Sequence, residues 1–270
     1  MTDNCVYHEG ELAVQAQNGV ATAARLSAAA IQDRIPQAAM AFIAQQSMAV
    51  IGSLDAQGNV WASLVFGQPG FLRTGDGKSL WLQRSQCHIA FGDPLWRNLE
   101  ANEQLACISH HTPTASDHPS DLTGRSPSSR HNAVSTTSAP SSSPSPLPNQ
   151  RLAALATKYG EKCRLGILLI ELGTRRRLRI NGNVQSDNAR STREKAVRIQ
   201  VEQAYANCSK YIQRRSVEIG EPEQKSTSTD IHSGQSLNSA QQAWISGADT
   251  FFVASAHPSH GADVSHRGGH

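Results

Sequence analysis

The chain has 270 residues, a formal net charge of +3, 38% apolar residues and only 5% aromatic residues. So small a charge does not favour a nucleic acid or a membrane surface as a partner, and the low apolar content indicates that part of the chain lies outside any core. The sequence shows no apolar secretory signal and no apolar run long enough for a membrane span. Its five cysteines are widely spaced and form no CxxC motif, so the sequence favours a reducing, cytoplasmic location.

Residues 1–47 are predicted to form an N-terminal helical segment. An Ala-rich stretch favours a helix over residues 20–34. A second helix begins near Pro36, because proline fits the first turn of a helix. The apolar run of residues 48–54, the polar turn around Gly58 and a second apolar run then predict a β-hairpin.

Most of the remaining apolar segments favour strands. A short strand is predicted at 79–83, and Asp93 followed by proline is typical of a helix start. The apolar run 164–171 predicts a buried strand paired with 175–184, and alternation over 197–201 predicts another. Strands joined by tight turns favour a mainly β (α+β) fold, an antiparallel barrel or curled sheet with peripheral helices.

Composition divides the rest of the chain. Residues 112–149 are mostly Ser, Thr and Pro, and such a segment is predicted to be a disordered insertion within a β domain spanning 48–215. Residues 216–249 are expected to be a polar linker. Residues 250–270 repeat the strand-turn-strand pattern of the first hairpin, so we expect them to begin a second β-unit that is truncated at the C-terminus.

One candidate binding group lies in the run of arginines after the buried strand. Because side chains alternate between the two faces of a strand, Arg175, Arg177 and Arg179 are expected to share one face. Guanidinium groups donate paired hydrogen bonds to phosphate, so this face is a candidate anion site. The alternative is an ordinary solvated face near acidic neighbours such as Glu171.

A second candidate group lies near the C-terminus, where Ser265, His266 and Arg267 precede two glycines. A hydroxyl, an imidazole, a guanidinium and accessible backbone amides can together bind an anion, although a polar chain end would have the same composition. Lys210 lies in a predicted short helix, 205–214, where it is either an anion ligand or part of a solvated basic face.

The C-terminal region is also rich in histidine. His257, His260, His266 and His270, with Asp263, have the ligand types of a zinc site. Their spacing matches no standard zinc motif, so no metal site is predicted. GxGxxG after a strand, Walker A and GxSxG motifs are also absent from the sequence.

Several segments together resemble a known family. They are FIAQQSMAVIGSLDAQGNVWASLVFGQPGF, GDPLWRNL, LGILLIELGTRRRLRINGNV, NCSKYIQRR and DTFFVASAHPSHGADVSHRGG, in this order. They are similar to the flavin-nucleotide-binding proteins related to pyridoxamine 5'-phosphate oxidase, which have an FMN-binding split β-barrel fold. The resemblance implies a homodimer with FMN in the dimer groove and a small-molecule substrate that the sequence does not identify. Members of the family continue beyond SHRGG with further strands, and this chain ends at His270.

The resemblance also implies a set of candidate FMN ligands: Ser63, Arg177, Arg179, Lys210, Ser265, His266 and Arg267. It favours an FMN-dependent oxidoreductase. A flavin- or nucleotide-binding module without turnover, including a degenerate truncated relative, is the alternative, because the sequence places no evident general acid or base beside a substrate pocket. A third hypothesis is an interaction protein that acts through its Ser/Pro-rich insertion.

Overall fold

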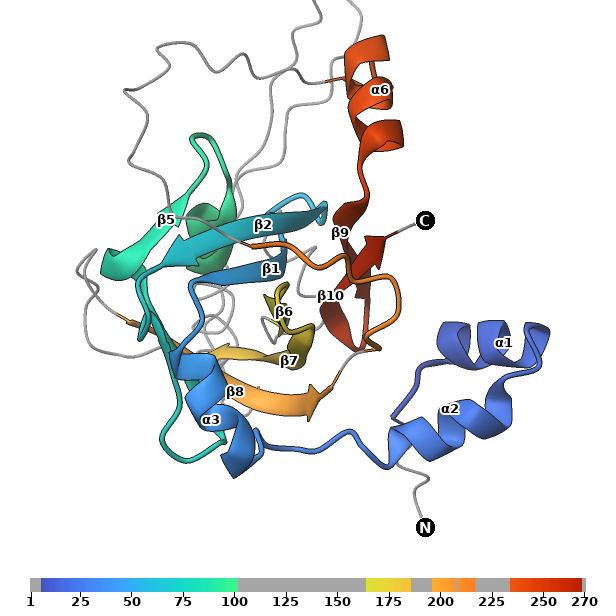
Figure 1. The fold of residues 1–270 in the computed structure, drawn as a ribbon, viewed down its shortest axis with the longest axis horizontal. Coiled ribbons are helices and arrows are strands. Elements are labelled where there is room, and N and C mark those ends of the chain that lie inside the picture. The colour runs from blue at the N-terminus through green and yellow to red at the C-terminus, as the bar shows by residue number, and fades with distance from the viewer. Residues whose placement is uncertain (1–5, 102–163, 186–195, 207, 217–233, 269–270) are drawn as a thin grey trace, which may run out of the picture.

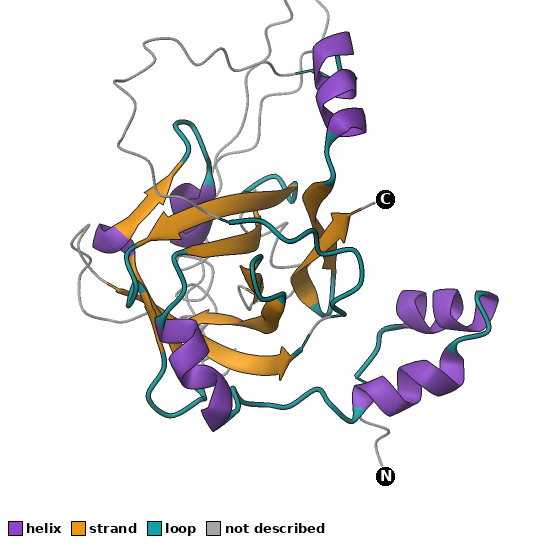
Figure 2. Ribbon diagram, in the orientation of Figure 1, coloured by secondary structure: helices purple, strands orange, loops and turns teal. Residues whose placement is uncertain are grey.

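The computed structural model describes residues 6–101, 164–185, 196–206, 208–216 and 234–268, drawn in Figures 1 and 2. The insertion expected at 112–149 lies outside the described residues.

Three helices lie in the N-terminal segment, of which the first was not expected from the sequence. They are α1 (Glu9–Gln17), α2 (Ala21–Ala28) and α3 (Gln37–Ala44). His8 caps α1 and forms a capping box with Glu11. The structure describes every residue of α1 and α2, and none of these residues is buried, whereas α3 buries Phe42 and Ile43. Accordingly, α1 and α2 lie side by side, away from most of the strands, whereas α3 packs beside the strands (Figure 1).

Eight antiparallel strands form the main sheet. They are β1 (Met48–Leu54), β2 (Val60–Gly67), β3 (Leu72–Arg73), β4 (Ser79–Gln83), β5 (Cys87–Ile89), β6 (Arg164–Glu171), β7 (Arg176–Gln185) and β8 (Ala196–Tyr205). Their order across the sheet is β3-β4-β8-β7-β6-β1-β2-β5. A 3-10 helix, Arg84–Gln86, joins β4 to β5, and residues 95–101 are helical after the predicted helix start at Asp93.

Short connections curl this sheet into a half-barrel. Residues 68–71 alone join β2 to β3, although these strands lie near opposite ends of the sheet order. A flat sheet could not place these edges so close together, because neighbouring strands stand about 4.8 Å apart. The predicted mainly β architecture with a curled antiparallel sheet and peripheral helices is therefore confirmed.

The concave side of the curl holds the main core. Buried side chains from the sheet and α3 meet there, among them Ile43, Ile51, Leu80, Ile167 and Ile199. None of these five side chains is measurably exposed. Burial of this cluster supplies the main stabilisation of the sheet.

A second hairpin covers the convex side of the central strands. It consists of β9 (Thr250–His257) and β10 (Gly261–Gly268), which form their own two-stranded sheet. Val264 of β10 packs against Val50 and Leu168, which face away from the main core. β1 and β6 are thus buried on both faces, which explains their unbroken apolar runs.

The hairpin lies so close to β6 that only glycine fits beneath it. A Cβ atom on Gly166 would lie 2.5 Å from the Cα atom of Asp263. The strand-turn-strand pattern expected over 250–270 is present in its described part as β9 and β10, and in the structure this hairpin packs directly on the first β-unit.

Two local expectations differ from the structure. The helix predicted over 205–214 is wrong, because β8 continues to Tyr205 and the described residues 208–216 contain no helix. The segment expected to be a polar linker contains the helix α6 (Ser239–Gly247), which is capped by Asn238. None of the helices in the described part of the chain is both long and apolar enough to cross a membrane.

Candidate functional site

A cleft of about 910 Å³ lies between the N-terminal helices, the convex face of β7 and β8, and the turn joining β9 to β10. Its volume falls within the range of about 300–1,000 Å³ that is typical of small-molecule sites. Polar side chains line it from all three parts, including Glu11, Arg179, Gln203 and Asp263. The cleft therefore depends on contacts between segments at the two ends of the sequence.

Arg177 and Arg179 both line the cleft, as their predicted position on one strand face requires. Leu178, between them, points into the main core. The expectation that Arg175 shares this face is wrong. β7 begins one residue later, and Arg175 lies in the turn with a φ of 61°, in the left-handed region.

Arg179 is a largely buried charged group of the cleft, with 11% of its side chain exposed. Its Nη1 atom donates hydrogen bonds to Asp263 Oδ2 and to the Tyr205 hydroxyl, both at 2.9 Å. Its buried Nε atom has no hydrogen-bond partner among the described residues. Because an unsatisfied buried donor is costly, this atom is a candidate contact for a bound acceptor.

Burial sets the acidity of the groups around Arg179. It raises the pKa of Asp263 above its ordinary value, and the charge of Arg179 opposes this shift. Burial, with the charge of Asp263, raises the pKa of Tyr205 to about 12. The phenol of Tyr205 therefore stays neutral at physiological pH, and the Arg179–Asp263 pair holds both side chains in place.

The C-terminal candidates form a neighbouring cluster that does not line the cleft. The His266 side chain is buried, and its Nε2 atom lies 3.3 Å from the carbonyl oxygen of Lys210. Burial lowers the pKa of His266, and the positive charge of Arg267 contributes to that shift. Arg267 donates from Nη1 to the Ser265 hydroxyl at 3.0 Å. Lys210 thus contacts this cluster through its backbone carbonyl, and Lys210 as a whole is exposed to solvent.

Ser63 lies apart from the other candidates. It is 1% exposed and shares the concave face of β2 with the core residue Val65. Its hydroxyl donates to Asp93 Oδ1 at 2.7 Å, and the same oxygen accepts the backbone N–H of Leu95 at the start of the helix that follows. Within one chain, Ser63 is therefore on the opposite side of the sheet from Arg177 and Arg179.

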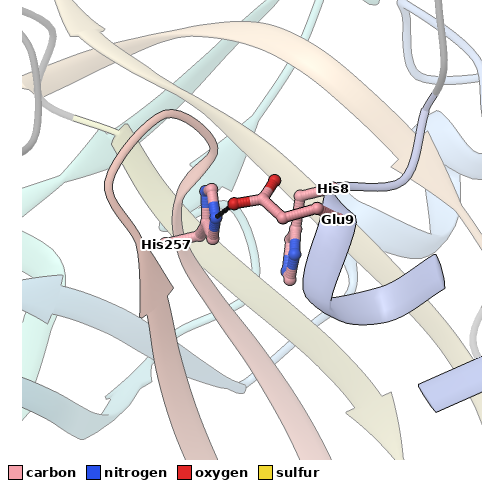
Figure 3. Close-up of side chains that lie close together, drawn as sticks. All are labelled: His8, Glu9 and His257. Atoms are coloured by element: carbon pink, nitrogen blue, oxygen red, sulfur yellow. Dashed lines mark hydrogen bonds and ion pairs between the residues drawn. The ribbon is translucent and has the colours of Figure 1, made fainter. Parts of the chain in front are cut away.

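The structure also brings together side chains that sequence reasoning did not combine. His8 and Glu9, at the start of α1, meet His257 at the end of β9, and Figure 3 shows the three side chains together. His257 Nε2 lies 3.1 Å from Glu9 Oε1 across a sequence separation of 248 residues. No local spacing pattern could have revealed this cluster, because its members come from opposite ends of the chain.

Comparison with protein families, with curated proteins and with solved structures finds no match for this chain. Any function must therefore be inferred from the residues and their arrangement. The cleft offers two guanidinium groups on one wall, a neutral phenol, and the amides of Asn181 and Gln203. These groups can bind an anionic ligand that also has hydrogen-bonding edges.

Proposed function

We propose that this chain is an FMN-binding protein, a flavin-dependent oxidoreductase related to pyridoxamine 5'-phosphate oxidase, and that the curled sheet is its split barrel. The observation that carries the proposal is the pair Arg177 and Arg179, which project from one strand face into a cleft of suitable volume. The unpartnered Nε of Arg179 supports it, because a phosphate oxygen would satisfy this donor.

The cleft residues fit the parts of FMN. Arg177 and Arg179 bind the phosphate, while the Asn181 and Gln203 amides can pair with the donors and acceptors at the edge of the flavin ring. Tyr205 adds an aromatic surface beside Arg179, whose guanidinium carbon lies 5.4 Å from the centre of the tyrosine ring. When bound, FMN supplies the redox chemistry, and the chain supplies its position and electrostatic surroundings.

A homodimer is part of the same proposal. Phe66 of β2, with Phe251 and Val253 of β9, is 40–45% exposed. β2 and β9 are in contact, so these apolar side chains belong to adjacent strands. Exposed apolar side chains on neighbouring strands favour association with a second chain. Light scattering coupled to size-exclusion chromatography measures the mass and tests this part separately.

The alternative is a flavin-binding module without turnover. It is favoured by the nature of the groups beside Arg179. Tyr205, with a pKa of about 12, is a weak acid at neutral pH, and Asp263 is engaged by Arg179. Reduction of the bound flavin by a nicotinamide cofactor would support the oxidoreductase. Stable binding of FMN without reduction would support the module.

The test is FMN titration of the purified chain, followed by absorbance spectra before and after desalting. Arg177→Gln removes one phosphate contact, and Arg179→Gln combined with Asp263→Asn removes both partners of the buried ion pair without leaving one charge alone. A lost charge-assisted hydrogen bond costs about 1.5–3 kcal/mol, so each variant should bind FMN at least about tenfold more weakly.

Arg176→Gln is the matched control, because Arg176 is on the same strand and its guanidinium lies over the Phe42 ring of α3. This control should bind FMN like the wild-type chain. If the wild-type chain binds no FMN, the proposal is wrong. If it binds FMN and the cleft variants bind it equally well, the site lies elsewhere.

A further inference from the structure

The geometry points to a divalent transition-metal site, best suited to Zn²⁺, formed by His8, Glu9 and His257 at the rim of the cleft. One ligand atom from each residue lies within 4.8 Å of the other two. Figure 3 shows Glu9 directed at the His257 ring, with the His8 ring beside it. This site does not depend on FMN binding.

Two imidazoles and one carboxylate form a recognised zinc ligand set that leaves one position open. Metal–ligand bonds of about 2.0–2.2 Å in a tetrahedron place the ligand atoms about 3.3 Å apart. The Glu9 Oε1 to His257 Nε2 distance of 3.1 Å is already close to this value. To complete the ligand set, a nitrogen of the His8 ring must move closer to the other two ligand atoms. This ring stacks on the His257 ring, with the two ring centres 4.1 Å apart.

Metal binding would change the tautomer of His257. In the structure its Nδ1 atom accepts the backbone N–H of Ser259 at 3.3 Å, so the proton lies on Nε2, which faces Glu9. With a metal on Nε2, the proton moves to Nδ1, which gives up the Ser259 N–H and can instead donate to the Ser259 hydroxyl, 3.1 Å away. A hydrogen bond of this kind fixes the tautomer and orientation of a ligating histidine.

Metal binding has a defined cost at His8. Its Nδ1 atom accepts the backbone N–H groups of Gly10 and Glu11 and so caps α1. A neutral imidazole has one lone pair on nitrogen, so a metal on either nitrogen displaces this cap. The start of α1 is exposed, and water can then take over the released backbone N–H groups.

The site's position indicates what the metal would do. α1 and α2, described along their whole lengths, bury no residue, so apolar packing contributes little to holding them against the sheet. Gln32 links the segment after α2 to Ala204 of β8 through two backbone hydrogen bonds. A metal at the start of α1 would add a second attachment of this helical pair, fasten α1 to the β9–β10 turn and fix one wall of the cleft.

The first experiment is calorimetric titration of ZnCl₂ into the chelator-treated full chain. His8→Asn keeps a good helix cap but removes the imidazole, and Glu9→Gln and His257→Asn each remove one ligand. Each variant should bind Zn²⁺ at least about tenfold more weakly than the wild-type chain, since even partners outside the ligand shell contribute about 10–100-fold. His88→Asn is the matched control, because His88 is an exposed histidine on β5, and it should leave the affinity unchanged.

The second experiment measures trypsin cleavage after Arg25, an exposed residue of α2. Zn²⁺ should slow this cleavage at least several-fold in the wild-type and His88→Asn chains, and not in the His257→Asn chain. The proposal is overturned if the three ligand variants bind Zn²⁺ like the wild-type chain, if His88→Asn loses as much affinity as they do, or if the wild-type chain binds no Zn²⁺. It is equally overturned if Zn²⁺ leaves cleavage after Arg25 unchanged.

Discussion

Truncation of Val264 tests whether the β9–β10 hairpin is part of the cooperative fold. Val264 is 1% exposed and packs against Val50 and Leu168 on the convex face of the main sheet. Val264→Ala removes about two methylene equivalents of buried surface, worth about 1.6 kcal/mol. The cavity left between these strands adds to this cost, so we expect the free energy of unfolding to fall by about 2–3 kcal/mol.

Urea unfolding followed by circular dichroism, together with calorimetry, measures this change. A loss of this size corresponds to a Tm about 4–12 °C lower for a domain of this size. Val60→Ala is the matched control, because it makes the same truncation at a residue of β2 that is 38% exposed. It should change stability by less than about 0.5 kcal/mol. Equal stabilities of the two variants would refute the packing of the hairpin on the sheet.

Three further predictions test separate parts of the structure. Ser63→Ala should destabilise the fold by about 1 kcal/mol, because it removes the hydrogen bond to Asp93. It should leave FMN affinity unchanged, and a weaker FMN titration would instead place Ser63 in the site. Burial holds the pKa of His266 below its ordinary value of 6.5, so the unfolded chain takes up a proton that the folded chain does not, and stability falls as the pH drops below 6.5. Urea unfolding at several pH values measures how steeply the free energy of unfolding falls with pH below 6.5. His266→Asn should reduce this slope by at most about 1.4 kcal/mol per pH unit, and an unchanged slope would contradict this account. Gly166→Ala should cost about 1–3 kcal/mol, because its Cβ would lie 2.5 Å from the β10 backbone, whereas Gly75→Ala, with no atom within 4 Å of its Cβ, should leave the Tm unchanged. A Gly166→Ala chain as stable as Gly75→Ala would mean that β10 does not approach β6 so closely.

Local sequence patterns predicted most of the long strands. The first hairpin, the buried strand β6, its partner β7 and the alternating strand β8 were all expected from apolar runs, alternation and turn residues. Such signals extend over a few residues and need no distant contact. The strands β3 and β5 were not predicted, because their two and three residues carry too little pattern.

The candidate site was predicted only in part, because local patterns do not reveal contacts between distant segments. The shared face of Arg177 and Arg179 follows from alternation within one strand, and the structure places both in the cleft. The partners of Arg179, Tyr205 and Asp263, come from β8 and β10, and no local pattern links them to β7. The same holds for the meeting of His8 with His257.

The sequence by itself thus determined the mainly β character, the first hairpin and the arginine face, because each depends on the period of a single segment. Only the tertiary structure decided which face of the sheet each candidate occupies. Ser63 lies on the concave side and the arginines on the convex side, although all of them are on strands of one sheet. The curl of the sheet and the docking of β9–β10 against Gly166 set this arrangement, and both depend on packing between segments far apart in the chain.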